Sequence, residues 1–184
     1  MSDTQKKKNN VLLQMIKIIS LLIIPTIYCF NLISHFVINN DVKDFKFCDT
    51  IEPAYKDDFK EVFKQINDYN IFYVEENPFS KNLICDYNGN DYLGFTSFKT
   101  DNTTDIYISN KLKNTPITRY NVMLHEVAHS LGLNHTDYGI MKYKVRTDRY
   151  GYIMEDYDKL YLDLDDIKGL RFVKNNLRCS KPTE

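Results

Sequence analysis

The chain has 184 residues, which is enough for one folded domain and a short appendage. Its formal net charge is −1, so the composition indicates neither a nucleic acid nor another strongly charged partner. Histidine is rare, with four residues in all, and three of them fall between positions 125 and 135. That concentration makes residues 125–135 the first candidate for a functional site.

The N-terminal segment divides into a polar and an apolar part. Residues 1–10 are polar and end with three lysines and two asparagines, whereas residues 11–38 are mainly apolar and long enough to cross a bilayer as a helix. The preceding lysines predict that residues 1–10 form a cytosolic tail, which leaves residues 41–184 lumenal or extracellular. A buried soluble helix is disfavoured, because the apolar residues surround the helix instead of forming one stripe.

Two interpretations of residues 11–38 remain open. A signal-anchor would keep the chain in the membrane as a single-pass protein, and a signal peptide would be cleaved to release a secreted one. We favour the anchor, because no small-residue cleavage site is evident near residues 28–34.

Four cysteines are present, one in the apolar segment and three in the body of the chain: Cys29, Cys48, Cys85 and Cys179. A body exported to an oxidising compartment can form one disulfide and leave one thiol. Cys48 and Cys179 lie near its two ends and are a plausible tether, although the pairing cannot be read from sequence.

Five short runs have the composition or the alternation of β-strands, at residues 45–48, 71–74, 83–87, 93–98 and 105–109. Pro53 stands where a helix can begin, and apolar residues at helical spacing predict a helix from Ala54 to about Tyr69. A second helix is predicted from Thr118 to about Leu131, and a third from Leu164 to Lys174.

The stretch HEVAHSLGLNH, residues 125–135, has the spacing of a metal site. His125 and His129 are four residues apart, so on a helix they share one face. Gly132 permits the sharp turn that brings His135 back as a third ligand. Three imidazoles suit Zn²⁺ and leave a fourth position for water, and Glu126 is placed to take a proton from that water.

The residues HEVAHSLGLNHT resemble the zinc-binding signature of the metzincin metalloproteases, and their ending is most similar to the matrixin branch. This resemblance implies an α+β, zincin-like catalytic domain over residues 41–184. It further implies a mixed five-stranded sheet, an active-site helix and a C-terminal helix, with strand 93–98 at the sheet edge. An edge strand can pair with an extended peptide.

The same resemblance implies a methionine-containing turn beneath the zinc. Met141 and Met154 are both candidates, and we favour Met141 because matrixin-like proteins keep this connection short. Tyr143 is a candidate for holding the oxyanion, since some metzincins carry a tyrosine two residues after the methionine. Residues 86–91 offer several oxygen ligands that could bind Ca²⁺, as matrixin loops in this region can, although a plain hairpin turn is preferred.

The sequence therefore predicts a zinc-dependent endopeptidase that acts on protein or peptide substrates. His125, His129 and His135 are its metal ligands and Glu126 is its general base. The alternative is an inactive or non-peptidase zinc protein at the cell surface that binds peptides or receptors.

Overall fold

The computed structural model describes residues 42–89 and 91–179. No helix in these two ranges is long and apolar enough to cross a membrane. The predicted span at residues 11–38 lies outside them, so the anchor and the signal peptide both stay predictions.

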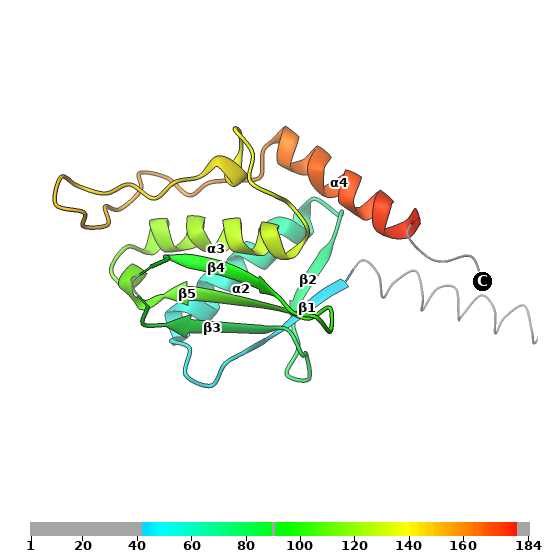
Figure 1. Cartoon of the computed structure of the whole chain (residues 1–184), viewed down its shortest axis with the longest axis horizontal. Helices are drawn as coiled ribbons and strands as arrows, with labels where there is room; N and C mark the ends of the chain where they lie inside the picture. Colours follow the sequence, from blue (N-terminus) through cyan, green and yellow to red (C-terminus); the bar gives the residue numbers. More distant parts are fainter. Residues whose placement is uncertain (1–41, 90, 180–184) are drawn as a thin grey trace, which may run out of the picture. The chain divides into compact units, whose positions relative to one another are not determined.

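Five strands form one mixed sheet within the described chain (Figure 1). The strands are β1 (Val42–Phe47), β2 (Tyr73–Glu76), β3 (Leu83–Tyr87), β4 (Gly94–Phe98) and β5 (Thr104–Ser109). Their order in the sheet is β2-β1-β3-β5-β4, and only the β4–β5 pairing is antiparallel. Strand β4 is therefore at the edge of the sheet, as predicted for residues 93–98.

Three α-helices accompany the sheet: α2 (Pro53–Asp68), α3 (Pro116–Ser130) and α4 (Leu164–Cys179). Two short 3-10 helices, η1 (Asn110–Leu112) and η2 (Ile140–Lys142), flank α3 in sequence. Pro53 begins α2 and Pro116 begins α3, each where a missing backbone N–H costs no helical hydrogen bond. The predicted elements are confirmed, with end points that differ by at most five residues.

The core lies between one face of the sheet and helices α2 and α3. Alternation in β1 buries Phe45 and Phe47, whose rings contact Phe63 and Phe59 of α2. Helix α3 packs against β4 and β5, and it also packs against α2. This burial of apolar area places α3 firmly beside the edge strand.

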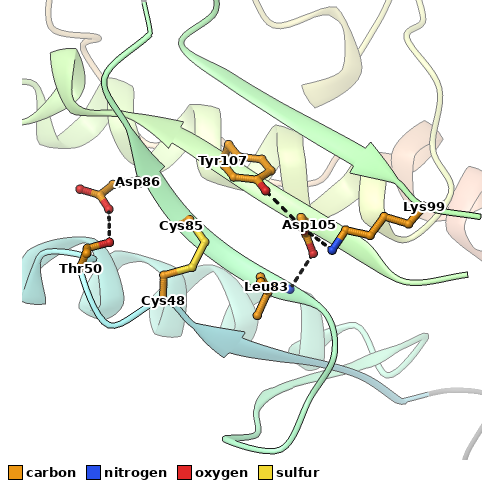
Figure 2. Close-up of a disulfide and its surroundings, with 8 residues drawn as sticks. All are labelled: Cys48, Thr50, Leu83, Cys85, Asp86, Lys99, Asp105 and Tyr107. Atoms are coloured by element: carbon orange, nitrogen blue, oxygen red, sulfur yellow. Dashed lines mark hydrogen bonds and ion pairs between the residues drawn. A yellow bond between two sulfur atoms is a disulfide. The ribbon is translucent and has the colours of Figure 1, made fainter. Parts of the chain in front are cut away.

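The opposite face of the sheet carries a disulfide and a polar cluster, which Figure 2 shows together. Cys48 is bonded to Cys85, so the tether suggested between Cys48 and Cys179 is wrong. The bond follows from register, because β1 and β3 are neighbours and the two Cα atoms are 5.1 Å apart. A disulfide of this kind is typical of proteins that fold outside the cytosol.

Removing this disulfide should destabilise the domain. The bond closes a loop of 37 residues, for which chain entropy gives about 3–4 kcal/mol of unfolding free energy. We expect the double variant Cys48→Ser, Cys85→Ser to lose about that amount in urea unfolding followed by circular dichroism. Reduction should weaken the parent and leave the double variant unchanged, and equal sensitivity of both proteins would contradict the assignment.

Candidate metal centre

Helix α3 carries the first two histidines of the motif on one face. The helix is buried along nearly all of its length, and His125 and Glu126 are themselves buried. Its N-terminus has no side-chain cap from Thr115. Instead Glu155, far along the chain, accepts hydrogen bonds from the backbone N–H groups of Ile117 and Thr118 at 2.6 and 3.0 Å.

The helix ends at the glycine that the sequence marks as a turn. Gly132 has φ +99°, a left-handed conformation that favours glycine. Leu133 N–H bonds back to the carbonyl of Ala128 at 3.1 Å, which reverses the chain. Space gives a second reason for glycine, because a Cβ on Gly132 would lie 2.9 Å from Val173 of α4. The reversal carries His135 back towards α3.

The three histidines converge as predicted. His135 Nε2 lies 3.1 Å from His125 Nε2 and 3.1 Å from His129 Nε2, and the candidate ligand atoms all lie within 4.8 Å of one another. Tetrahedral ligands at a Zn–N distance of about 2.05 Å are separated by about 3.3 Å. The imidazole donors and their spacing therefore fit zinc, and this triad could hold it.

Hydrogen bonds fix which ring nitrogen faces the centre. His125 Nδ1 donates to the carbonyl of Ile140 at 2.8 Å, and His129 Nδ1 donates to the carbonyl of Leu133 at 2.7 Å. A carbonyl oxygen can only accept, so in each ring Nδ1 carries the proton and Nε2 keeps its lone pair for a metal.

Burial favours the neutral form of both rings. It lowers the pKa of His125 to about 4, helped by the neighbouring histidines, and it also lowers the pKa of His129. At neutral pH a metal ion therefore does not have to displace protons from these two ligands.

The turn at η2 lies beneath the triad and supplies one of those carbonyls. Met141 is 2 % exposed, whereas Met154 is 38 % exposed, and Met141 as the methionine of the turn stays a prediction. Asp166 of α4 holds this turn from below, because its Oδ2 accepts the N–H of Ile140 at 3.0 Å. Gly139, at φ +63°, leaves room for that carboxylate, since a Cβ there would lie 2.5 Å from Asp166 Oδ1.

The side chain of Glu126 extends from α3 towards the edge strand β4. It is 6 % exposed, and its Oε2 accepts a hydrogen bond from Thr96 Oγ1 of β4 at 2.8 Å. Gly94 makes the approach possible, because a Cβ there would lie 3.0 Å from Glu126 Cγ and 2.6 Å from Val122. Burial raises the pKa of Glu126 to about 7, and the Thr96 hydrogen bond opposes this rise.

The hydroxyl of Tyr143 already makes a hydrogen bond in this structure. It donates to Asp156, whose Oδ2 also accepts from Asn121 Nδ2 at 2.8 Å. Burial and this carboxylate raise the pKa of Tyr143 well above its ordinary value. A role for Tyr143 in holding an oxyanion stays a prediction, and it would require this hydrogen bond to be exchanged.

Residues 86–91, where a hairpin turn is preferred over a calcium site, have hydrogen bonds of their own. Thr50 Oγ1 donates to Asp86 at 3.2 Å, and Asn110 Nδ2 donates to Asn88 at 2.8 Å. Residue 90 lies outside the described ranges, so binding of Ca²⁺ at residues 86–91 stays a prediction.

Comparison with solved structures finds a similar fold in a chain of the "GM1 bound form of the ECX AB5 holotoxin". The TM-score is 0.52 and the sequences are 14 % identical, over 75 % of this chain and 82 % of that one. No family model and no curated protein sequence matches the chain. At this identity the likeness establishes the fold, and the motif itself carries the chemistry.

Asp166 should stabilise both the domain and the metal centre. Asp166→Ala removes the acceptor for Ile140 N–H and for Asp163 N–H, so we expect a loss of about 2–3 kcal/mol in unfolding free energy. Asp166→Asn keeps an acceptor oxygen of the same shape and should lose less. Urea unfolding and zinc competition with a chelator measure the two effects, and equal behaviour of both variants would argue against this role.

Thr96 and Glu126 should be energetically coupled in the zinc-free chain. A double-mutant cycle of Thr96→Val and Glu126→Gln isolates their interaction, and we expect about 1–2 kcal/mol at pH 8. The hydrogen bond favours the ionised carboxylate, so the coupling should shrink at pH 5, below the pKa of about 7. Thr96→Ser keeps the hydroxyl and is the matched control. Zero coupling at both pH values would show that this contact does not hold Glu126.

Proposed function

We propose that the chain is a zinc-dependent endopeptidase of the metzincin type, with a matrixin-like catalytic domain. The observation that supports this most strongly is the convergence of three Nε2 atoms beside a buried carboxylate at the edge of a sheet. Each part has a role in hydrolysis of a peptide bond.

His125, His129 and His135 are the proposed ligands. Bound there, zinc would polarise the peptide carbonyl and lower the pKa of a water molecule. Glu126 is the proposed general base, and it follows the first ligand directly in sequence. In this position the carboxylate can accept a proton from that water and then pass it to the leaving amine.

Thr96 and Gly94 support Glu126 in complementary ways. The Thr96 hydroxyl occupies Oε2, and the missing side chain of Gly94 leaves space beside Oε1. One carboxylate oxygen is thereby anchored and the other is available for proton transfer.

The substrate is proposed to bind along β4. As an edge strand, β4 can hydrogen-bond an extended peptide through its backbone, and α3 lies alongside with the histidines. A peptide added in this way would place one of its carbonyls beside the metal. The substrate class is therefore an extended polypeptide.

The disulfide supports an extracellular or lumenal location for the domain. We propose that residues 11–38 direct it there, as a signal-anchor or as a cleaved signal peptide. The membrane is then a partner only through this segment.

Glu126→Gln should keep zinc and lose peptide-bond cleavage. The substitution preserves the shape of the side chain and removes its basicity, so we expect a fall in kcat of about 10²–10⁴-fold. Cleavage of a denatured protein library, mapped by mass spectrometry with a chelator control, measures activity, and elemental analysis measures bound zinc.

Two outcomes would count against the proposal in different ways. Cleavage by Glu126→Gln at the parental rate would exclude the mechanism. A parent that binds zinc and cleaves no peptide would favour the alternative of a surface protein that only binds its partners.

A further inference from the structure

Residues 143–157 form a projecting segment, here called the arm. In Figure 1 it runs back from η2 along α3, in yellow and orange, and extends past the N-terminal end of that helix. Its returning segment is fastened to α3 by partly buried hydrogen bonds. Thr118 Oγ1 donates to Met154 O at 3.1 Å and accepts from Asp156 N at 2.8 Å, and Glu155 caps the helix.

The outer half of the arm is a hairpin with its own hydrogen bonds. Thr147 and Ile153 form an antiparallel bridge, flanked by bonds from Met154 N to Arg146 O and from Asp148 N to Tyr152 O, both at 2.9 Å. Val145 and Ile153 pack against the core. The outward side chains of the arm are thus presented on an ordered support.

Acidic and basic side chains are segregated in the arm. Its three carboxylates are engaged internally: Asp148 accepts from two N–H groups of the turn, Glu155 caps α3, and Asp156 accepts from Tyr143 and Asn121. Lys144 and Arg149 are exposed, as is Lys142 just before the arm. The three cations and three carboxylates of the arm cancel in formal charge, but its exposed charged side chains are the two cations Lys144 and Arg149.

Exposed tyrosines lie among these cations. Tyr150, Tyr152 and Tyr157 are 69, 73 and 81 % exposed. The guanidinium of Arg146 lies 4.2 Å from the ring centroid of Tyr157, and its Nη2 donates a hydrogen bond to the Tyr157 hydroxyl at 3.2 Å. Tyrosine and arginine are also the residues enriched at binding hot spots.

The two ends of the arm lie near α3, and its C-terminal end lies close to the metal centre. Asp156 contacts Asn121, which precedes His125 by one helical turn, a rise of about 6 Å. Strand β4 runs in the same sense as α3, since Gly94 faces Val122 and Glu126 whereas the later Thr96 faces Glu126. A peptide antiparallel to β4 would run the opposite way, so the residues after its scissile bond would approach the arm.

We propose that the arm binds acidic side chains of the polypeptide substrate, located a few residues after the scissile bond. This rests on the proposed function, and it assigns the charge class of that substrate. Lys144 and Arg149 supply the exposed cations, and the three tyrosines supply contact area around them.

Binding can be measured without cleavage. The full chain carrying Glu126→Gln, loaded with zinc, is titrated into fluorescent peptides that differ only in having Asp and Glu, or Asn and Gln, after the central bond. The test variant is Lys144→Glu with Arg149→Glu, and the matched control is Lys81→Glu with Lys111→Glu, two exposed lysines outside the arm with the same change in net charge.

We expect the arm variant to weaken binding of the acidic peptide at least tenfold and of the neutral peptide less than twofold. The control variant should change neither by more than twofold. Binding of the acidic peptide should also weaken as salt rises, because exposed charges are screened.

Equal effects on both peptides, or no effect on either, would overturn the proposal. Binding of an anionic vesicle or a sulfated polysaccharide to the arm, without binding of the acidic peptide, would also overturn the proposal, in favour of a different anionic ligand. Cleavage by the parent chain is assayed in parallel on both peptides. A parent that binds the acidic peptide through the arm and cuts neither peptide would refute the endopeptidase and leave the arm as a binding surface.

Discussion

Two backbone carbonyls determine the geometry of the metal centre. The oxygens of Leu133 and Ile140 accept the Nδ1 protons of His129 and His125, so both Nε2 lone pairs point at the same place. Both carbonyls belong to the chain reversal after α3, which also delivers His135. One segment of about ten residues therefore supplies a ligand and orients the other two, and the histidine spacing on the helix would be insufficient without it.

That segment depends in turn on α4. Val173 packs where Gly132 lacks a side chain, Leu133 packs against Gly169, and Asp166 holds the N–H of Ile140. Burial of a carboxylate costs desolvation free energy, and it raises the pKa of Asp166. Hydrogen bonds from two backbone N–H groups offset part of that cost. The last helix is thus part of the site although it contributes no ligand, because it fixes the turn on which the ligands rely.

The sequence predicts what depends on local spacing. The i, i+4 histidines, the turn at Gly132 and the five strands are all local patterns, and the structure confirms them within a few residues. It does not predict contacts that depend on register between distant segments. Cys48 meets Cys85 because β1 and β3 are neighbours, and neither cysteine carries that information in its own surroundings.

The same limit explains why the sequence does not identify Thr96 and Gly94 as site residues. In sequence they are ordinary members of a strand, thirty residues before the motif. They acquire a role only when the antiparallel pairing with β5 turns their side of β4 towards α3, since Thr96 pairs with the buried Ile106 and Gly94 with the buried Ile108. Alternation then puts both on the face that meets Glu126, and Phe95 and Ser97 on the other.

Helix α3 is where these separate requirements meet. Its C-terminal half carries the histidines and needs a fixed turn, whereas its N-terminal half lacks a local cap and takes one from Glu155. The residues that complete this helix are therefore also those that anchor the arm, through Thr118 and Asn121. A substitution that loosens Glu155 or Asn121 would disturb helix and arm together, so the position of the positive surface is tied to the position of the metal ligands. Under the proposed function, this coupling would hold the arm in a fixed position relative to the metal centre, where it can contact the polypeptide substrate.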